Sequence, residues 1–255
     1  RRTGAELPVQ TEDVIRYALT RKLNYKPGTR YSYSNLGYAV LGEIIEEIIG
    51  MGYEDYVQIS LLNPLGIKGM QIGHGYYEDR APGEVKYYEV SGTQKVLAYD
   101  SKDKYVPRVY GGNDISLLGA AGGWIGSPAD VLKLAVAIDG FNSSPDILMP
   151  ETIRTMTDSR KSRYNMIGWK GTDGKGTWWR TGTLTGTSAL IVRQNNGINW
   201  IIVTNTTTWK RSRIHSETSR TMFRAVYSVN EWPDYDLFDY QAPLELPSMY
   251  LTRTD

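Results

Sequence analysis

The sequence predicts an α+β fold, and three features support this class. Helical stretches and long loops make up the first two thirds of the chain, β-branched apolar stretches gather after Gly168, and one more helical stretch follows them. Helices followed by an antiparallel hairpin are typical of α+β architectures. With 255 residues, 40% of them hydrophobic, the chain can bury a core in one large domain or two small ones.

The helices expected in the first part have start signals and apolar stripes. In the first of them Thr11 is the cap, and two acidic residues follow it at the positive end of the helix dipole. In the fourth, Ser127 is the cap and Pro128 takes the first helical position. The expected helices are Thr11–Leu23, Asn35–Ile49, Tyr53–Leu62, Ser127–Ile138 and Pro150–Met156.

Residues 66–123 show little periodicity and contain many Gly, Pro, Tyr and Asp residues. A loop of this length is uncommon in a compact domain unless it is functional, so we expect it to form one wall of a binding cleft. The domain organisation predicted from these patterns is a helical, loop-rich subdomain over 1–166, a sheet subdomain over 167–232 and an extended surface tail over 233–255.

The predicted strands are Thr177–Thr181, Ser188–Arg193 and Ile198–Asn205, with a hairpin turn between the last two. Because neighbouring strand residues face opposite sides, one of Trp178 and Trp179 should enter the core and the other should wall the cleft. A last helix is expected over residues 212–229. Three strands and one helix leave an open edge, so we expect further strands in an N-terminal segment absent from this chain.

Composition excludes several classes of function. The net charge is +1 and its charges are scattered, which argues against a nucleic-acid-binding protein. There is no Cys, which excludes thiol catalysis and iron–sulfur clusters, and the two His, His74 and His215, are expected to be surface or structural residues rather than catalytic ones. No apolar run approaches the roughly 18 residues of a membrane span. The chain begins at Arg1 without Met or a signal peptide, which we interpret as a processed, truncated or incomplete sequence.

Three stretches carry residues that could take part in catalysis or substrate binding. They are Tyr33-Ser34-Asn35 at a helix start, Gly119–Trp124, and Arg180-Thr181-Gly182-Thr183 on a strand. Their order and spacing resemble the penicillin-recognising serine hydrolases, specifically the class C β-lactamase-like branch, which includes D-alanyl-D-alanine carboxypeptidases, D-aminopeptidases and esterases. The resemblance extends from Thr11 to about Val229. It implies a β-lactamase/transpeptidase-like fold, in which an antiparallel sheet flanked by helices adjoins a mostly helical subdomain.

This family uses three motifs around one cleft: Ser-x-x-Lys, Tyr-x-Asn and a Lys-Thr-Gly-like strand. Tyr33-Ser34-Asn35 matches the second motif, and Arg180-Thr181-Gly182 stands in the place of the third. The single Ser-x-x-Lys, Ser101–Lys104, follows the Tyr-x-Asn motif instead of preceding it, and a solvated loop explains it better. We therefore expect the nucleophilic Ser and its Lys on the absent N-terminal segment, either removed by proteolysis, disordered or present as a separate chain.

The resemblance implies a role for each matching residue. Tyr33 is the expected general base or proton relay, Asn35 a contact to the substrate amide, and Arg180 an anchor for a substrate carboxylate. Gly182 lets the substrate lie against the strand, and the backbone N–H of Thr183 donates to the oxyanion. Structural explanations compete with these roles, since Tyr33 is one of 19 Tyr, Asn35 suits a helix cap, and Arg180 suits an exposed strand paired with a carboxylate.

The function expected is that of a serine hydrolase acting by acyl transfer on a peptide, β-lactam or ester substrate, in the bacterial periplasm or envelope. The resemblance implies no metal or organic cofactor. The expected partners are that small-molecule or peptide substrate and the chain's own N-terminal segment, with no nucleic acid and no membrane span. The alternatives are a non-catalytic binding module of the same fold, without a nucleophile, and an unrelated hydrolase using Ser101 and Lys104.

Overall fold

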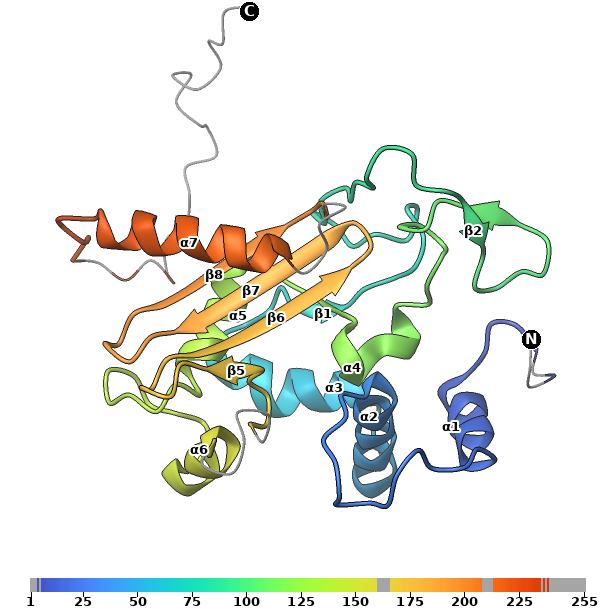
Figure 1. The fold of residues 1–255 in the computed structure, drawn as a ribbon, viewed down its shortest axis with the longest axis horizontal. Coiled ribbons are helices and arrows are strands. Elements are labelled where there is room, and N and C mark those ends of the chain that lie inside the picture. Colours follow the sequence, from blue (N-terminus) through green and yellow to red (C-terminus); the bar gives the residue numbers. More distant parts are fainter. Residues whose placement is uncertain are drawn as a thin grey trace, which may run out of the picture.

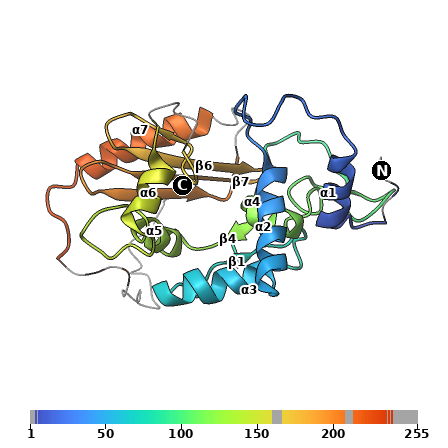
Figure 2. The same cartoon turned by 90° about the horizontal axis from the view of Figure 1, so that it is seen from below.

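The computed structural model describes residues 6–159, 166–207 and 213–234, together with Gly4, Asp236 and Phe238. In this part of the chain a four-stranded antiparallel sheet has helices on both faces, and a group of helices lies beside one end of it (Figure 1, Figure 2). This arrangement confirms the α+β class.

The sheet has the order β5-β6-β7-β8, and each strand is antiparallel to its neighbours. All three predicted strands are present. The first continues past Thr181 because its later residues pair with β7, and a short further strand, β5, pairs with its beginning. The bounds are β5 Gly171–Thr172, β6 Trp178–Leu184, β7 Thr187–Arg193 and β8 Asn199–Thr204.

Helix α7 (Arg213–Tyr227) covers one face of the sheet, and α5 (Pro128–Val136) covers the other (Figure 2). The core under α7 combines Trp200 and Val226, both buried, with the partly buried ring of Trp179. Apolar side chains on alternate strand positions meet the apolar stripe of the helix here, which is the ordinary way that such layers bury their surface.

The two adjacent Trp residues of β6 point to opposite faces, as expected. Trp179 enters the core under α7. Whether its neighbour Trp178 walls a cleft stays a prediction. The Arg193 guanidinium lies 4.0 Å from the centroid of the Trp178 ring, and the Trp169 ring is 5.9 Å away. The Trp178 ring therefore packs against Arg193 and Trp169 on the face of the sheet opposite α7.

The helical group contains α1, α2, α3 and α4, and α2 packs closely on α4 at Gly42, where an added Cβ would lie 2.8 Å from the Cβ of Ala120. Helix α1 ends earlier than expected, because the N–H and the hydroxyl of Thr20 both donate to the Tyr17 carbonyl, at 3.1 Å and 2.7 Å. The bounds are α1 Thr11–Leu19, α2 Asn35–Ile49, α3 Tyr53–Val57 continued by a π-helical turn Gln58–Leu62 and a 3-10 turn Asn63–Leu65, α4 Gly119–Gly122 and α6 Pro150–Thr157.

Residues 66–123 are less irregular than expected. They contain strand β1, the hairpin of β2 and β3, and a 3-10 turn before α4. Strand β1 pairs with β4, which follows this segment directly at residues 124–125. The segment also reaches the sheet, since the N–H of Tyr88 donates to the Asn205 carbonyl at 3.0 Å. Its place as a cleft wall stays a prediction. The bounds are β1 Gln71–Ile72, β2 Val96–Leu97, β3 Tyr105–Val106, the 3-10 turn Ser116–Leu118 and β4 Trp124–Ile125.

The expected tail over 233–255 lies almost wholly outside the described residues, as does the expected start of the last helix at Ser212. Within the part of the chain that the structure covers, no helix combines the length and the apolar character that crossing a bilayer requires.

Candidate active site

Ser34 fixes the start of α2, and this position determines where its two neighbours lie. Its Oγ accepts a hydrogen bond from the Gly37 N–H at 3.0 Å, so Ser34 is the N-cap and Asn35 the first helical residue. The competing explanation of Asn35 as the cap is therefore wrong. Tyr33 precedes the cap in extended chain, and its side chain is 56% exposed. Tyr33 and Asn35 are thus both exposed at the amino end of one helix.

On β6 the motif residues alternate between the two faces of the sheet. Thr181 and Thr183 share the α7 face with Trp179, while Arg180 and Gly182 point to the opposite face. A Cβ added to Gly182 would meet nothing within 4 Å, so open space lies over this position. No ion pair of Arg180 is found within the described ranges, so the structural explanation of a carboxylate partner has no support there.

The backbone of Thr183 faces an edge of β6 that β5 does not cover. The Lys170 N–H, just before β5, donates to the Trp179 carbonyl at 2.8 Å, so the polar backbone groups of Trp179 point to the β5 edge. Because strand residues alternate in this direction, the groups of Thr181 and Thr183 point to the same edge, beyond the end of β5. Within the described ranges no hydrogen bond from the Thr183 N–H is found, and an N–H that is free to donate beside an open glycine is what an oxyanion donor requires.

Two residues that sequence reasoning did not assign to the site contact this strand on its α7 face. The Nζ of Lys170 donates to the Thr181 hydroxyl at 2.9 Å. The Nε2 of His215 lies 2.9 Å from Ser188 Oγ, 3.3 Å from Thr183 Oγ1 and 3.2 Å from the Gly182 carbonyl oxygen. No signal in the sequence links His215 to a strand more than thirty positions earlier, because only the packing of α7 brings them together.

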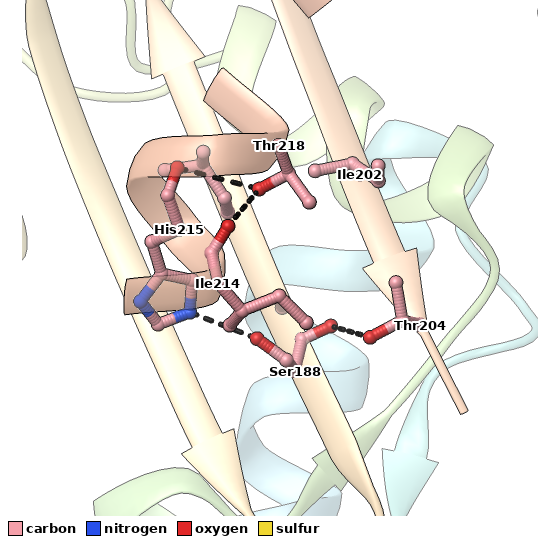
Figure 3. Close-up of a pocket in the computed structure, with 8 residues that line it drawn as sticks. Ser188, Ile202, Thr204, Ile214, His215 and Thr218 are labelled. Atoms are coloured by element: carbon pink, nitrogen blue, oxygen red, sulfur yellow. Dashed lines mark hydrogen bonds between the residues drawn. The ribbon is translucent and has the colours of Figure 1, made fainter. Parts of the chain in front are cut away.

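Burial lowers the pKa of His215 below its ordinary value, the Gly182 carbonyl opposes this shift, and the positive charge of Lys170 adds to it. Figure 3 shows His215 reaching from the first turn of α7 to Ser188. Ser188 is only 4% exposed, and the crevice that it lines has no room for a water molecule. The Ser188–His215 pair is therefore a packed contact and has no space for a substrate carbonyl.

The pair Ser101 and Lys104 has the geometry of a polar turn. The Ser101 hydroxyl donates to Asp103 Oδ1 at 2.8 Å and accepts from the Lys104 N–H at 3.1 Å. The Lys104 ammonium lies 4.8 Å from the centroid of the Tyr76 ring, so it does not activate the hydroxyl. This geometry matches the interpretation of a solvated loop.

A polar cavity of about 420 Å³ lies between α1, α2 and α3, and neither motif contributes to its lining. Two of its carboxylates cap backbone groups, since Glu46 accepts from the Tyr53 N–H at 2.6 Å and Glu54 from the Ile72 N–H at 2.7 Å. Among the residues that the structure describes, no three His, Asp or Glu side chains converge on a point where they could hold a metal ion.

The two motifs lie on separate elements, α2 in the helical group and β6 in the sheet. Figure 2 shows the helical group at the end of the sheet where β6 turns into β7, and Figure 1 shows α4 between α2 and the sheet. Within the described ranges no hydrogen bond or ion pair joins Tyr33 or Asn35 to Arg180. The fold thus presents an exposed phenol and amide at the amino end of α2 and, separately, a strand with an open edge at β6.

Comparison with known proteins agrees with this fold. The chain is 30% identical over 86 residues to Protein flp of Staphylococcus aureus, a stretch that covers 34% of this chain and 17% of that protein. Its structure is similar to a D-amino acid amidase from Ochrobactrum anthropi, with a TM-score of 0.62 at 19% identity over 88% of this chain and 65% of the amidase. A penicillin-binding protein homologue from Pyrococcus abyssi gives a TM-score of 0.55 at 24% identity over 87% of this chain and 49% of that one.

This chain spans less than two thirds of the length of each of these relatives. A family model described as Beta-lactamase matches residues 2–220, which include both motifs and the whole sheet. The chain belongs to the Beta-lactamase family and has the fold of its serine hydrolases.

Proposed function

We propose that the complete protein is a serine hydrolase that transfers an acyl group from a peptide, β-lactam or ester substrate to a serine and then hydrolyses the acyl-enzyme. The bond that breaks is the amide or ester C–N or C–O bond, and the leaving amine or alkoxide takes up a proton. Water then attacks the serine ester and releases the acid. The family membership supports this reaction class, and the name of the amidase neighbour favours an amide substrate.

The observation that carries the proposal is the geometry of β6 at Gly182 and Thr183. A negative charge develops on the carbonyl oxygen as the serine attacks, and a fixed N–H aimed at it stabilises the transition state more than the substrate. The Thr183 N–H faces an open edge, and Gly182 leaves room for a substrate beside it. These are the requirements for half of an oxyanion hole.

The remaining roles are assigned by position. Tyr33 relays the proton between the nucleophile and the leaving group, Asn35 bonds the substrate amide, and Arg180 pairs with a substrate carboxylate from the face of β6 that it shares with Gly182. Neither Ser101 nor Ser188 suits the role of nucleophile, because the first is tied into a turn and the second is buried. We place the nucleophilic Ser and its Lys on another segment of the whole protein, because the single Ser-x-x-Lys of this sequence follows the Tyr-x-Asn motif instead of preceding it.

The same observation about Ser101 and Ser188 favours the second candidate, a binding module of this fold without a nucleophile. The two candidates differ in covalent chemistry. The complete gene product is treated with an activated ester and with a β-lactam, and its intact mass is measured under denaturing conditions. A mass increase equal to the acyl group supports the hydrolase. Absence of any adduct, together with no release of amine from a D-amino acid amide, overturns it and favours the binding module.

A further inference from the structure

We propose that His215 is a positioning residue that aims the N–H of Thr183 by holding the carbonyl oxygen of Gly182. This inference rests on the proposed function, because it concerns the oxyanion donor of that site. The side chain of His215 comes from α7, on the far side of β6 from Gly182's open face, so it acts on the backbone and does not touch the substrate.

The argument begins with the peptide group between Gly182 and Thr183. Because a trans peptide is planar, the carbonyl oxygen of the first residue and the N–H of the second are fixed at opposite ends of one rigid unit. A group that holds the Gly182 oxygen in the direction of β7 therefore holds the Thr183 N–H in the direction of the open edge. The Nε2 of His215 lies 3.2 Å from that oxygen.

The strand needs such a support at this point. Gly182 has no side chain to pack, and glycine is the residue with the most backbone freedom. Strand β5 ends before this position, so only β7 pairs with the backbone of β6 here. His215 contacts both residues of the peptide group, since its Nε2 also lies 3.3 Å from the Thr183 hydroxyl oxygen.

The helix end that carries His215 is itself fixed. Ile214 is buried against the sheet, and the Thr218 hydroxyl donates to the Ile214 carbonyl at 2.8 Å (Figure 3). Ser188, directly opposite Thr183 in the register, places its hydroxyl 2.9 Å from Nε2. The contact between Ser188 and His215 is direct, and the crevice that they line has no room for a water molecule. A shift of the His215 side chain should therefore move the backbone of β6 that it contacts.

Among the residues that the structure describes, the charged group acting on His215 from a neighbouring element is Lys170, and the groups that contact it from β6 and β7 are uncharged. Burial and Lys170 keep the imidazole neutral over most of the physiological range. Because Nε2 donates to the Gly182 carbonyl in the neutral ring, protonation at acid pH takes place at Nδ1, and the positive charge strengthens the bond from Nε2 to that carbonyl. The direction of the Thr183 N–H should respond to that change.

The first experiment measures acylation by the complete protein for wild type, His215→Leu and His215→Gln. We expect His215→Leu to lower kcat about 10- to 100-fold with little change in KM, because misaligning a catalytic group by about 1 Å costs up to roughly 100-fold. His215→Gln keeps an amide donor and should recover most of the rate, without the acid inflection of the wild-type pH profile. Thr221→Ala is the matched control, because Thr221 is exposed on α7 and its hydroxyl donates to the Glu217 carbonyl at 3.2 Å, away from His215 and β6. Thermal melting checks that each variant folds.

A second measurement does not depend on activity. In protein labelled with ¹⁵N-threonine, the Thr183 amide resonance should follow the titration of His215 in wild type and lose this response in His215→Gln. If the amide does not follow the titration and His215→Leu keeps the wild-type kcat, the inference is wrong while the hydrolase stands. If wild type forms no acyl-enzyme but the Thr183 amide resonance still follows the titration of His215, the proposed function is wrong. The contact between His215 and the Gly182 carbonyl is then still supported.

Discussion

Lys170 donates a hydrogen bond of 2.9 Å from its Nζ to the hydroxyl oxygen of Thr181, the middle residue of Arg180-Thr181-Gly182. The sequence directs attention to Arg180 as the cation of this motif. The structure adds a second cation on the opposite face of β6, close enough to act electrostatically on His215. This pair of cations, one on each face, leads to the first prediction.

Lys170→Met should raise the pKa of His215. Removal of the positive charge takes away one of the two causes that disfavour the imidazolium, while the Gly182 carbonyl still favours it. The measurement is the His215 ring resonance as a function of pH. Lys175→Met, in the turn between β5 and β6, is the control. An unchanged or lowered pKa in Lys170→Met would contradict the electrostatic link.

The free energy of unfolding should rise with pH in the window just below the ordinary His pKa of 6.5. The pKa of His215 is lowered in the folded chain, so the unfolded chain binds more protons between the two values. The contribution is complete above 6.5 and is lost as pH falls through the folded value. Urea unfolding at several pH values measures it. His215→Gln should flatten this part of the curve, whereas Thr221→Ala, on the exposed side of α7, should not. Parallel curves for wild type and His215→Gln would contradict the prediction.

Arg193→Met should destabilise the fold by roughly 3 kcal/mol, because it leaves buried carbonyl acceptors without their donor. Arg193 is buried, donates from Nε to the Asp139 carbonyl at 2.9 Å and from Nη1 to the Gly176 carbonyl at 2.6 Å, and its guanidinium stacks on Trp178.

The matched control for that variant is Arg154→Met. Arg154 pairs with Glu151 on the surface, with side chains 68% and 70% exposed. We expect a change below about 0.5 kcal/mol, since exposed ion pairs contribute little. Urea unfolding measures the loss of stability in both variants. Equal losses would contradict the expectation that the buried Arg193 contributes more stability than the exposed Arg154.

Gly182→Ala should leave stability within about 0.5 kcal/mol of wild type, because the new methyl group enters open space. Acylation should fall about tenfold, since that space is where the proposed substrate lies and a misplaced substrate reacts slowly. The contrast is Gly186→Ala in the adjacent turn, where φ is +81° and a Cβ would lie 2.4 Å from Val109. That variant should lose more than about 1 kcal/mol of stability. Normal acylation by Gly182→Ala would argue against a substrate on this strand.

Tyr33→Phe should lower the acylation rate of the complete protein by about 10²- to 10⁴-fold, the range of a proton-transfer group. Its side chain is 56% exposed, so the melting temperature should not change. Tyr105→Phe, 66% exposed on β3, controls for the loss of a surface phenol. If both variants acylate like wild type, Tyr33 is not the relay.

Local signals in the sequence were sufficient for the long elements. The bounds of α2 follow from the Ser34 cap and from Gly50, which takes the left-handed conformation at φ 70°. The strands β7 and β8 follow from their β-branched residues and the turn between them. Short pairings were not predictable: β1 and β4 consist of two residues each, and nothing in so short a stretch distinguishes a strand from a loop.

The sequence by itself determined the α+β class and the main helices and strands, because cap residues, periodicity and motif order are local properties. It also pointed to the roles proposed for Tyr33, Asn35, Arg180, Gly182 and Thr183, which stay proposals. Only the tertiary structure decided what those residues face. The docking of α7 brings His215 to the Gly182 carbonyl, and the short length of β5 leaves the Thr183 edge open. These contacts join elements that are distant in the chain. They depend on the packing of the complete fold, which no local stretch of sequence specifies.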